Sequence, residues 1–299
     1  MSNDIAECAL CRTKKKLVNS HIIPSFVGKY IKETSATGLL RKIEEPNARI
    51  QDLIKKPLLC KSCEDIFSKY EKYFAEKIFI PLNQKCSFQK SKCNFKYNEN
   101  LLKYIISQSW RILYSDYDEY FKDKLSSEGQ QEISKVIDDW RLYLLNKTNW
   151  NEQTTHYLFF WTYISITDIE IPNRFEFYIK RDVDGTIASD KEKKIIIVFT
   201  QIPSISIISA IRPRYLLGWE DAEIFKEGII GTPQSIDSYD LDFNEFIIGR
   251  AKKIQENKMS EGQQQKILEA ILKNPERFKI SKTFEAFSEE FRRRDISFE

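Results

Sequence analysis

Two Cys-x-x-Cys pairs constrain the fold of this chain more than any other feature of its sequence. The first pair is Cys8 and Cys11, and the second is Cys60 and Cys63. Each pair can present two sulfurs to one ion, and two such pairs form the ligand set of a tetrahedral structural zinc. The spacing therefore predicts one Zn²⁺ bound by all four cysteines. Because the segment between the pairs has little apolar content, we expect metal binding to supply much of its folding free energy.

The other two cysteines, Cys86 and Cys93, do not have the spacing of a zinc knuckle, and we expect unpaired thiols. Four cysteines in tight pairs indicate a metal site in a reducing compartment rather than a disulfide framework. Residues 1–4 lack the start of a secretion signal, and no uncharged apolar run is long enough to span a membrane. We therefore expect a cytoplasmic protein without a membrane span.

Positive charge is concentrated in the N-terminal third. The formal net charge is +3, but the first 100 residues hold 19 lysines and arginines against 11 aspartates and glutamates. A basic run, Lys14, Lys15 and Lys16, follows the first cysteine pair. This surplus fits a nucleic-acid partner, and the three lysines are candidate phosphate contacts. Ordinary solvation of a lysine-rich surface is the alternative explanation.

The apolar pattern predicts helices first and strands later in the chain. Helical spacing covers 25–33, 64–79, 98–121, 127–146, 242–255 and 261–272. Runs rich in Ile, Phe, Tyr and Val predict strands over 156–166, 174–181, 194–202 and 204–212, with a turn at Asp184-Gly185. The unbroken apolar run 195–199 predicts a central strand buried on both faces. Pro81 is expected to end the second helix, and 34–56 and 224–238 are expected to be loops.

These elements predict an α+β fold in three parts. Residues 1–82 form a zinc-binding module, 83–150 a helical connector, and 151–299 a mixed domain with a mainly antiparallel sheet. The third part is the candidate surface for a protein partner or for homo-oligomerisation. The chain has nine glycines and no glycine-rich phosphate-binding motif, which argues against a nucleotide-binding fold.

A histidine lies in the loop that the zinc would close. It is His21, in the sequence Ser20-His21-Ile22-Ile23-Pro24, and the chain has only one other histidine. A histidine titrates near neutral pH and can act as a general base, so His21 is a candidate catalytic residue. A structural role, in which His21 binds a backbone carbonyl, is the alternative. His156 starts an aromatic strand and is expected to be structural or on the surface.

The order of these motifs resembles the HNH endonucleases, which belong to the His-Me finger nucleases. The matching features are Cys-x2-Cys, then His-Ile-Ile-Pro, then Leu-Cys-x2-Cys opening a helix, over residues 5–80. The resemblance implies a treble-clef-like ββα-metal core and a metal-dependent endonuclease, with DNA as the expected substrate. Stand-alone proteins with this layout are often parts of bacterial anti-phage or mobile-element systems.

The resemblance also implies roles for single residues. His21 matches the general base, and Glu64, directly after the second cysteine pair, matches a ligand of a catalytic Mg²⁺ or Mn²⁺. Asn47 is the asparagine available to orient the base, although Gln51 competes for that role. Ser20 departs from the family, because an acid or a histidine that helps to bind the metal usually stands there.

Two other functions fit the same residues. The first is a non-catalytic zinc module that binds nucleic acid or protein, which the serine at position 20 favours. The second is an interaction protein in which the zinc only holds the N-terminal segment to the helices. Cleavage of plasmid DNA that depends on a divalent cation and on His21 would separate the nuclease from both alternatives.

Overall fold

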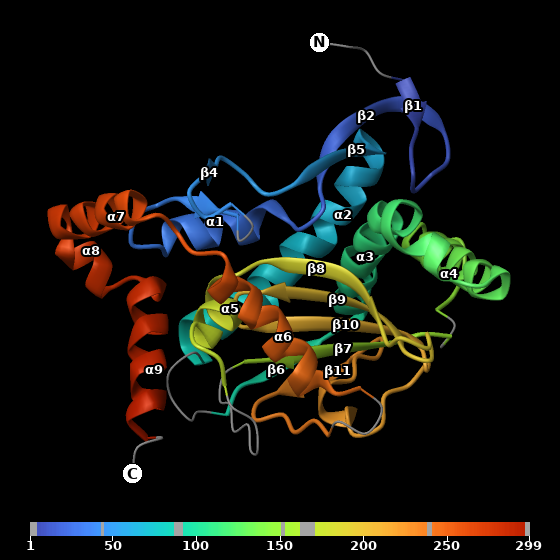
Figure 1. Ribbon diagram of the computed structural model, residues 1–299. Helices are drawn as coiled ribbons and strands as arrows, with labels where there is room; N and C mark the ends of the chain where they lie inside the picture. The colour runs from blue at the N-terminus through green and yellow to red at the C-terminus, as the bar shows by residue number, and fades with distance from the viewer. Residues whose placement is uncertain are drawn as a thin grey trace.

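A computed structural model describes the protein over residues 5–42, 45–86, 92–150, 153–161, 171–237 and 241–296. Within these ranges the fold is mixed α+β, and its sheets are antiparallel (Figure 1). The coarse prediction of an α+β fold is therefore confirmed.

The N-terminal part contains a small sheet with the strand order β1–β2–β5. Its strands are β1 (Ile5–Glu7), β2 (Lys14–His21) and β5 (Lys55–Cys60). The predicted helix after Cys60 is α2 (Lys61–Phe74), which follows β5 without a loop and packs against β2 and β5. Because β2 and β5 are antiparallel, Leu17 lies opposite Cys60 and His21 lies opposite Lys55. The cysteines and His21 are thus at opposite ends of the same sheet.

A long connection joins β2 to β5. It contains the predicted helix α1 (Ser25–Glu33) and the short strands β3 (Leu40–Arg41) and β4 (Arg49–Ile50). The end of this connection packs closely on α1, where a Cβ atom added at Gly28 would lie 3.0 Å from Leu53 Cγ. The absence of a side chain at Gly28 therefore lets residues 52–54 lie against α1.

The centre of the molecule is a four-stranded antiparallel sheet with the strand order β7–β10–β9–β8. The strands are β7 (Thr155–Phe160), β8 (Asp184–Ser189), β9 (Ile196–Ile202) and β10 (Ile205–Arg212). Every residue of β9 is buried. The prediction of a central strand buried on both faces is confirmed.

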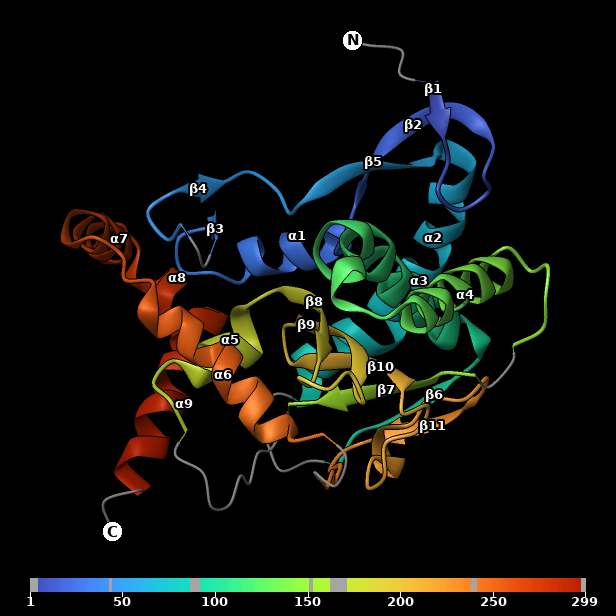
Figure 2. The same cartoon turned by 45° about the vertical axis from the view of Figure 1, so that its right-hand side comes forward.

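Helices cover both faces of this sheet (Figure 2). One face packs against α3 (Glu99–Asp116), which also contacts α2 and α4 (Ser127–Leu144). Its apolar core is continuous with the cysteine region, since Val198 and Ile207 belong to the same cluster as Cys60 and Phe67. The other face packs against α5 (Phe175–Arg181) and α6 (Phe243–Glu256).

Two further groups of elements complete the described fold. A two-stranded sheet contains β6 (Asn94–Tyr97) and β11 (Gly228–Gly231). The chain ends in α7 (Glu261–Lys273), α8 (Pro275–Lys279) and α9 (Lys282–Ile296), of which α9 packs against α5. These C-terminal helices return to the N-terminal part, where Lys282 N donates to Thr34 O at 2.9 Å.

The predicted strand over 174–181 is wrong, because this segment is the helix α5. Its alternating aromatic residues suit a strand, but Phe175, Tyr178 and Ile179 lie on one helical face and are buried against the sheet. The predicted turn at Asp184-Gly185 is also wrong. These residues begin β8, and they pair with Gln201 and Thr200 of β9.

Three smaller expectations also fail. Pro81 does not end its helix: a wide π-type turn over Ala75–Phe79 precedes it, and helical structure continues to Cys86. The predicted loop over 224–238 contains β11. Cys93 is disulfide-bonded rather than a free thiol, and the side chain of Cys86 lies outside the described residues.

The predicted boundaries after residues 82 and 150 stay a prediction. One apolar cluster contains residues from all three predicted parts, including Leu59, Ile105 and Ile205. No helix within the described ranges is long and apolar enough to cross a membrane.

Candidate metal centre and histidine site

The four predicted zinc ligands lie together. The sulfur atoms of Cys8, Cys11, Cys60 and Cys63 are all within 4.8 Å of one another, and Cys11 Sγ is 3.9 Å from Cys60 Sγ. A tetrahedral zinc with Zn–S bonds of about 2.3 Å separates its sulfurs by about 3.8 Å. The cluster therefore has the size and the ligands of a Cys₄ site that can bind a metal such as zinc.

Local backbone geometry explains how the first pair forms. Cys8 N donates to Thr13 O at 3.0 Å, and Arg12 N donates to Cys8 O at 2.8 Å. Arg12 adopts the left-handed conformation with φ 56°, which closes the knuckle between β1 and β2. From the second pair, Cys60 N donates to Cys8 Sγ at 3.3 Å. Each pair thus helps to orient the sulfurs toward one point.

The surroundings of the sulfurs favour a bound cation. Burial raises the pKa of the Cys8 and Cys63 thiols, whereas at Cys11 and Cys60 hydrogen bonds, chiefly those with Thr13 and Ser62, outweigh burial and lower the pKa. Thiolates at Cys8 and Cys63 are therefore costly unless a cation compensates them, and binding of a divalent metal releases their protons. The donor set thus fits zinc.

His21 ends β2, and its side chain makes one hydrogen bond within the described part of the chain. Its Nε2 lies 3.1 Å from Asp52 Oδ2, and its side chain is 18% exposed. An ionised carboxylate can only accept, so Nε2 carries the proton and donates. Nδ1 has no hydrogen-bond partner within the described ranges and keeps its lone pair. This is the protonation pattern of a histidine that can accept a proton at Nδ1.

Asp52 is itself held in place. Lys55 Nζ donates to Asp52 Oδ2 at 2.7 Å, and Leu53 N donates to Asp52 Oδ1 at 2.9 Å. The hydrogen bond from Lys55, followed by the one from His21, holds the pKa of the Asp52 carboxyl well below its usual range. Asp52 therefore stays ionised and can stabilise a protonated His21. Sequence reasoning missed Asp52; its position three residues before the start of the strand facing His21 was the available signal.

Ser20 and Glu64 form a separate contact on the other face of β2. Ser20 is fully buried, and its Oγ donates to Glu64 Oε2 at 2.7 Å. Consecutive strand residues point to opposite faces, so Ser20 points toward α2 whereas His21 does not. Glu64 thus binds the residue before the histidine, and Glu64 Oε1 has no hydrogen-bond partner among the described residues.

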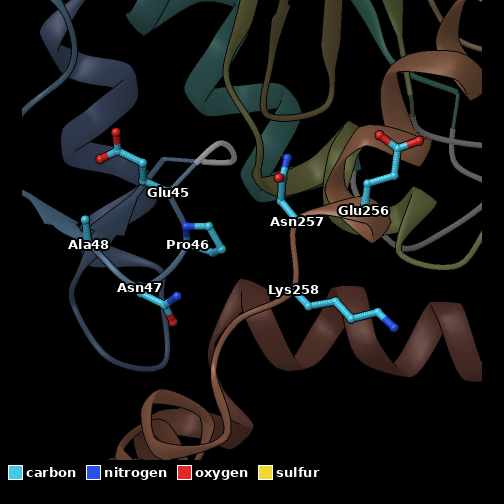
Figure 3. Close-up of a pocket in the computed structure, with 7 residues that line it drawn as sticks. All are labelled: Glu45, Pro46, Asn47, Ala48, Glu256, Asn257 and Lys258. Carbon is cyan, nitrogen blue, oxygen red and sulfur yellow. The ribbon is translucent and has the colours of Figure 1, made fainter.

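Asn47 does not bind the His21 ring, and its side chain contacts the start of α7 instead. Its Oδ1 accepts from Ser260 N at 2.9 Å, at the start of α7. Figure 3 shows Asn47 beside an open cleft of about 670 Å³ between residues 45–48 and 256–258. Among the described residues it is Asp52, not Asn47 or Gln51, whose side chain binds the His21 ring.

The basic run lies on the outer part of the small sheet. Lys14, Lys15 and Lys16 are exposed in β2, opposite Glu7, Ala6 and Ile5 of β1. They are accessible to a polyanion, but they lie at the cysteine end of β2 rather than beside His21. His156 is buried, and its Nδ1 lies 2.6 Å from Ser209 Oγ, which confirms the prediction of a structural role.

Comparisons of the chain with protein-family models, with curated proteins and with solved structures found no match.

Proposed function

We propose that this chain is a metal-dependent endonuclease of the HNH type that hydrolyses nucleic-acid phosphodiester bonds, with DNA as the expected substrate. The observation that carries the proposal is the pair formed by His21 and Asp52 at the end of β2. The strand–strand–helix unit bearing this pair also bears the Cys₄ cluster. This arrangement supports the treble-clef-like ββα core that the motif order predicts.

In this proposal His21 is the general base. Nδ1 accepts a proton from the attacking water, while Nε2–H remains bonded to Asp52. The resulting imidazolium is stabilised by the ionised Asp52 carboxylate. Lys55, bonded to Asp52, favours the ionised form of the carboxylate and so keeps the proton on His21.

Glu64 is the residue that would bind the catalytic cation. Its Oε1 can coordinate a metal ion while Oε2 remains hydrogen-bonded to Ser20. Mg²⁺ commonly uses only one or two protein carboxylates and completes its shell with water and substrate phosphate. When bound, the ion supplies positive charge that neutralises the leaving oxygen. The buried Cys₄ site would bind a separate, structural zinc.

The experiment is cleavage of supercoiled plasmid DNA in Mg²⁺ or Mn²⁺ by wild type and by Glu64→Gln. The variant keeps the shape of the side chain and the contact with Ser20, but removes the charge that a Mg²⁺ site needs. We expect cleavage by wild type and a much higher cation requirement in the variant, with equal zinc contents. Wild-type cation dependence in Glu64→Gln would contradict the assignment of Glu64.

One observation favours a second candidate, a zinc module that binds nucleic acid without cutting it. The hydrogen bond from the buried Ser20 occupies one oxygen of Glu64 and replaces the charged ligand that the resemblance implies at position 20. DNA binding that is lost on replacing Lys14, Lys15 and Lys16, with no cleavage in either cation, would favour this module over the nuclease.

A further inference from the structure

One face of α3 presents polar side chains that are buried, except for Ser115, which is half-buried. They are spaced four, three and four residues apart, which places them on a single helical face: Tyr104, Gln108, Arg111 and Ser115. Each has a buried side-chain atom without a hydrogen-bond partner among the described residues, namely Oη, Oε1, Nε and Oγ respectively.

The same face binds the backbone next to His21. Arg111 Nη1 donates to His21 O at 3.2 Å, and Gln108 Nε2 donates to Ile22 O at 3.1 Å. Lys56, which lies opposite Ser20 in the sheet, donates from Nζ to Ser115 O at 3.1 Å. Two positions on α3 thus contact the segment that carries the proposed base, and a third contacts the strand β5 that pairs with it.

Arg111 is held firmly by α2. Its guanidinium forms an ion pair with Glu71 and lies 4.8 Å from the centre of the Phe67 ring. Arg111 is 1% exposed, and a buried ion pair is weak evidence for stability. Its geometric effect is specific, because the planar guanidinium binds an acid of α2 and the carbonyl of His21 at once.

We propose that Arg111 is a positioning residue for His21. The proposal rests on the proposed nuclease function, in which the direction of the His21 ring matters. By holding the His21 carbonyl against α2, Arg111 fixes the backbone from which the His21 ring projects toward Asp52, and so its position relative to α2, the helix that carries Glu64. Arg111 contacts neither water nor substrate in this scheme. A displacement of about 1 Å at a reacting group can cost roughly 10²-fold in rate.

The test compares two buried arginines that both bind a backbone carbonyl of the N-terminal part. Arg141 is 8% exposed, donates from Nη1 to Leu10 O at 3.2 Å and pairs with Asp138. It therefore resembles Arg111 in being buried and in binding both an acid and a backbone carbonyl, but lies at the cysteine end of the sheet. Arg111→Lys and Arg141→Lys each keep the positive charge but remove the planar guanidinium group that binds two acceptors at once. Glu71→Gln is a second, milder way to release Arg111.

Cleavage kinetics, zinc content and the imidazole C–H signals of the two histidines are measured for each full-length variant. We expect Arg111→Lys and Glu71→Gln to lower kcat by roughly 10–10²-fold at unchanged KM, and to shift the His21 signals. Arg141→Lys should cleave like wild type and leave the His21 signals in place.

Equal losses of kcat in Arg111→Lys and Arg141→Lys, or His21 signals that do not move in Arg111→Lys, would overturn the positioning role. If wild type does not cleave DNA, the nuclease function fails, and the shift of the His21 signals still decides whether Arg111 positions the ring.

Discussion

Acid should destabilise this protein through His156, which is buried as a neutral imidazole. His156 Nδ1 donates to Ser209 Oγ, since that hydroxyl donates its own proton to Ser109 Oγ at 2.7 Å. Nε2 is buried with no partner among the described residues. The ring centres of Trp140 and Trp150 lie 5.5 and 5.1 Å from the centre of the His156 ring. Burial lowers the pKa of His156 to about 3. A charged imidazole therefore does not fit this site.

The sign and size of the effect follow from the two pKa values. In the unfolded chain His156 has a pKa of about 6.5, so below that pH the unfolded state binds a proton that the folded state does not. Stability is thus lost as the pH falls below about 6.5, by about 1.4 kcal/mol per pH unit, until the folded pKa near 3 is reached. Between about pH 7 and pH 4.5 the loss is roughly 2–3 kcal/mol.

Urea unfolding of wild type and His156→Gln at several pH values measures this contribution. The variant keeps a side-chain donor for Ser209 but does not titrate, and its fixed cost is measured at pH 7. Protonation of carboxylates and of the zinc thiolates affects both proteins equally, so the difference between them isolates His156. We expect wild type to lose roughly 2–3 kcal/mol more than the variant between about pH 7 and pH 4.5. Parallel pH dependence, or a His156 NMR signal that titrates above pH 5, would refute the reasoning.

Three further predictions concern the zinc, the base and the small sheet. Purified protein should contain one zinc. Cys63→Ser should abolish zinc binding and unfold the N-terminal part, because structural zinc contributes on the order of 10 kcal/mol in small modules. A zinc-free protein with an unchanged melting curve would contradict this. Asp52→Asn should lower kcat for cleavage by roughly 10²–10⁴-fold, because an amide can donate to Nε2 and favour the wrong tautomer; an unchanged kcat would remove Asp52 from the site. Gly231→Ala should lower the free energy of unfolding, measured by thermal unfolding, by about 1–3 kcal/mol, because the added Cβ would lie 2.4 Å from Cys93 O. An unchanged stability would mean that β6 and β11 separate freely.

Local patterns in the sequence were sufficient for the metal ligands and for most helices. The two cysteine pairs are tight knuckles whose geometry depends on few residues, so their spacing alone predicts a common ion. Helical periodicity located α1, α3, α4, α6 and α7 within a few residues. It failed at α5, where seven residues rich in aromatics suit a strand equally well and only packing against the sheet decides.

The partner of His21 could not be predicted in the same way. Asp52 reaches His21 because β2 pairs with β5 in one register and because Leu53 packs against Gly28 of α1. Both depend on the path of a connection that has almost no periodicity of its own. The same holds for Arg111, which is 90 residues from His21 and contacts it only once α3 has packed against α2.

The most direct test of the central claim is plasmid cleavage by His21→Gly in Mg²⁺, with and without added imidazole. The zinc-loaded variant should lose about 10²–10⁴-fold in rate, and free imidazole should restore part of it by occupying the space beside Asp52. Cleavage by His21→Gly at the wild-type rate without imidazole, from protein free of contaminating nuclease, would show that His21 is not the base.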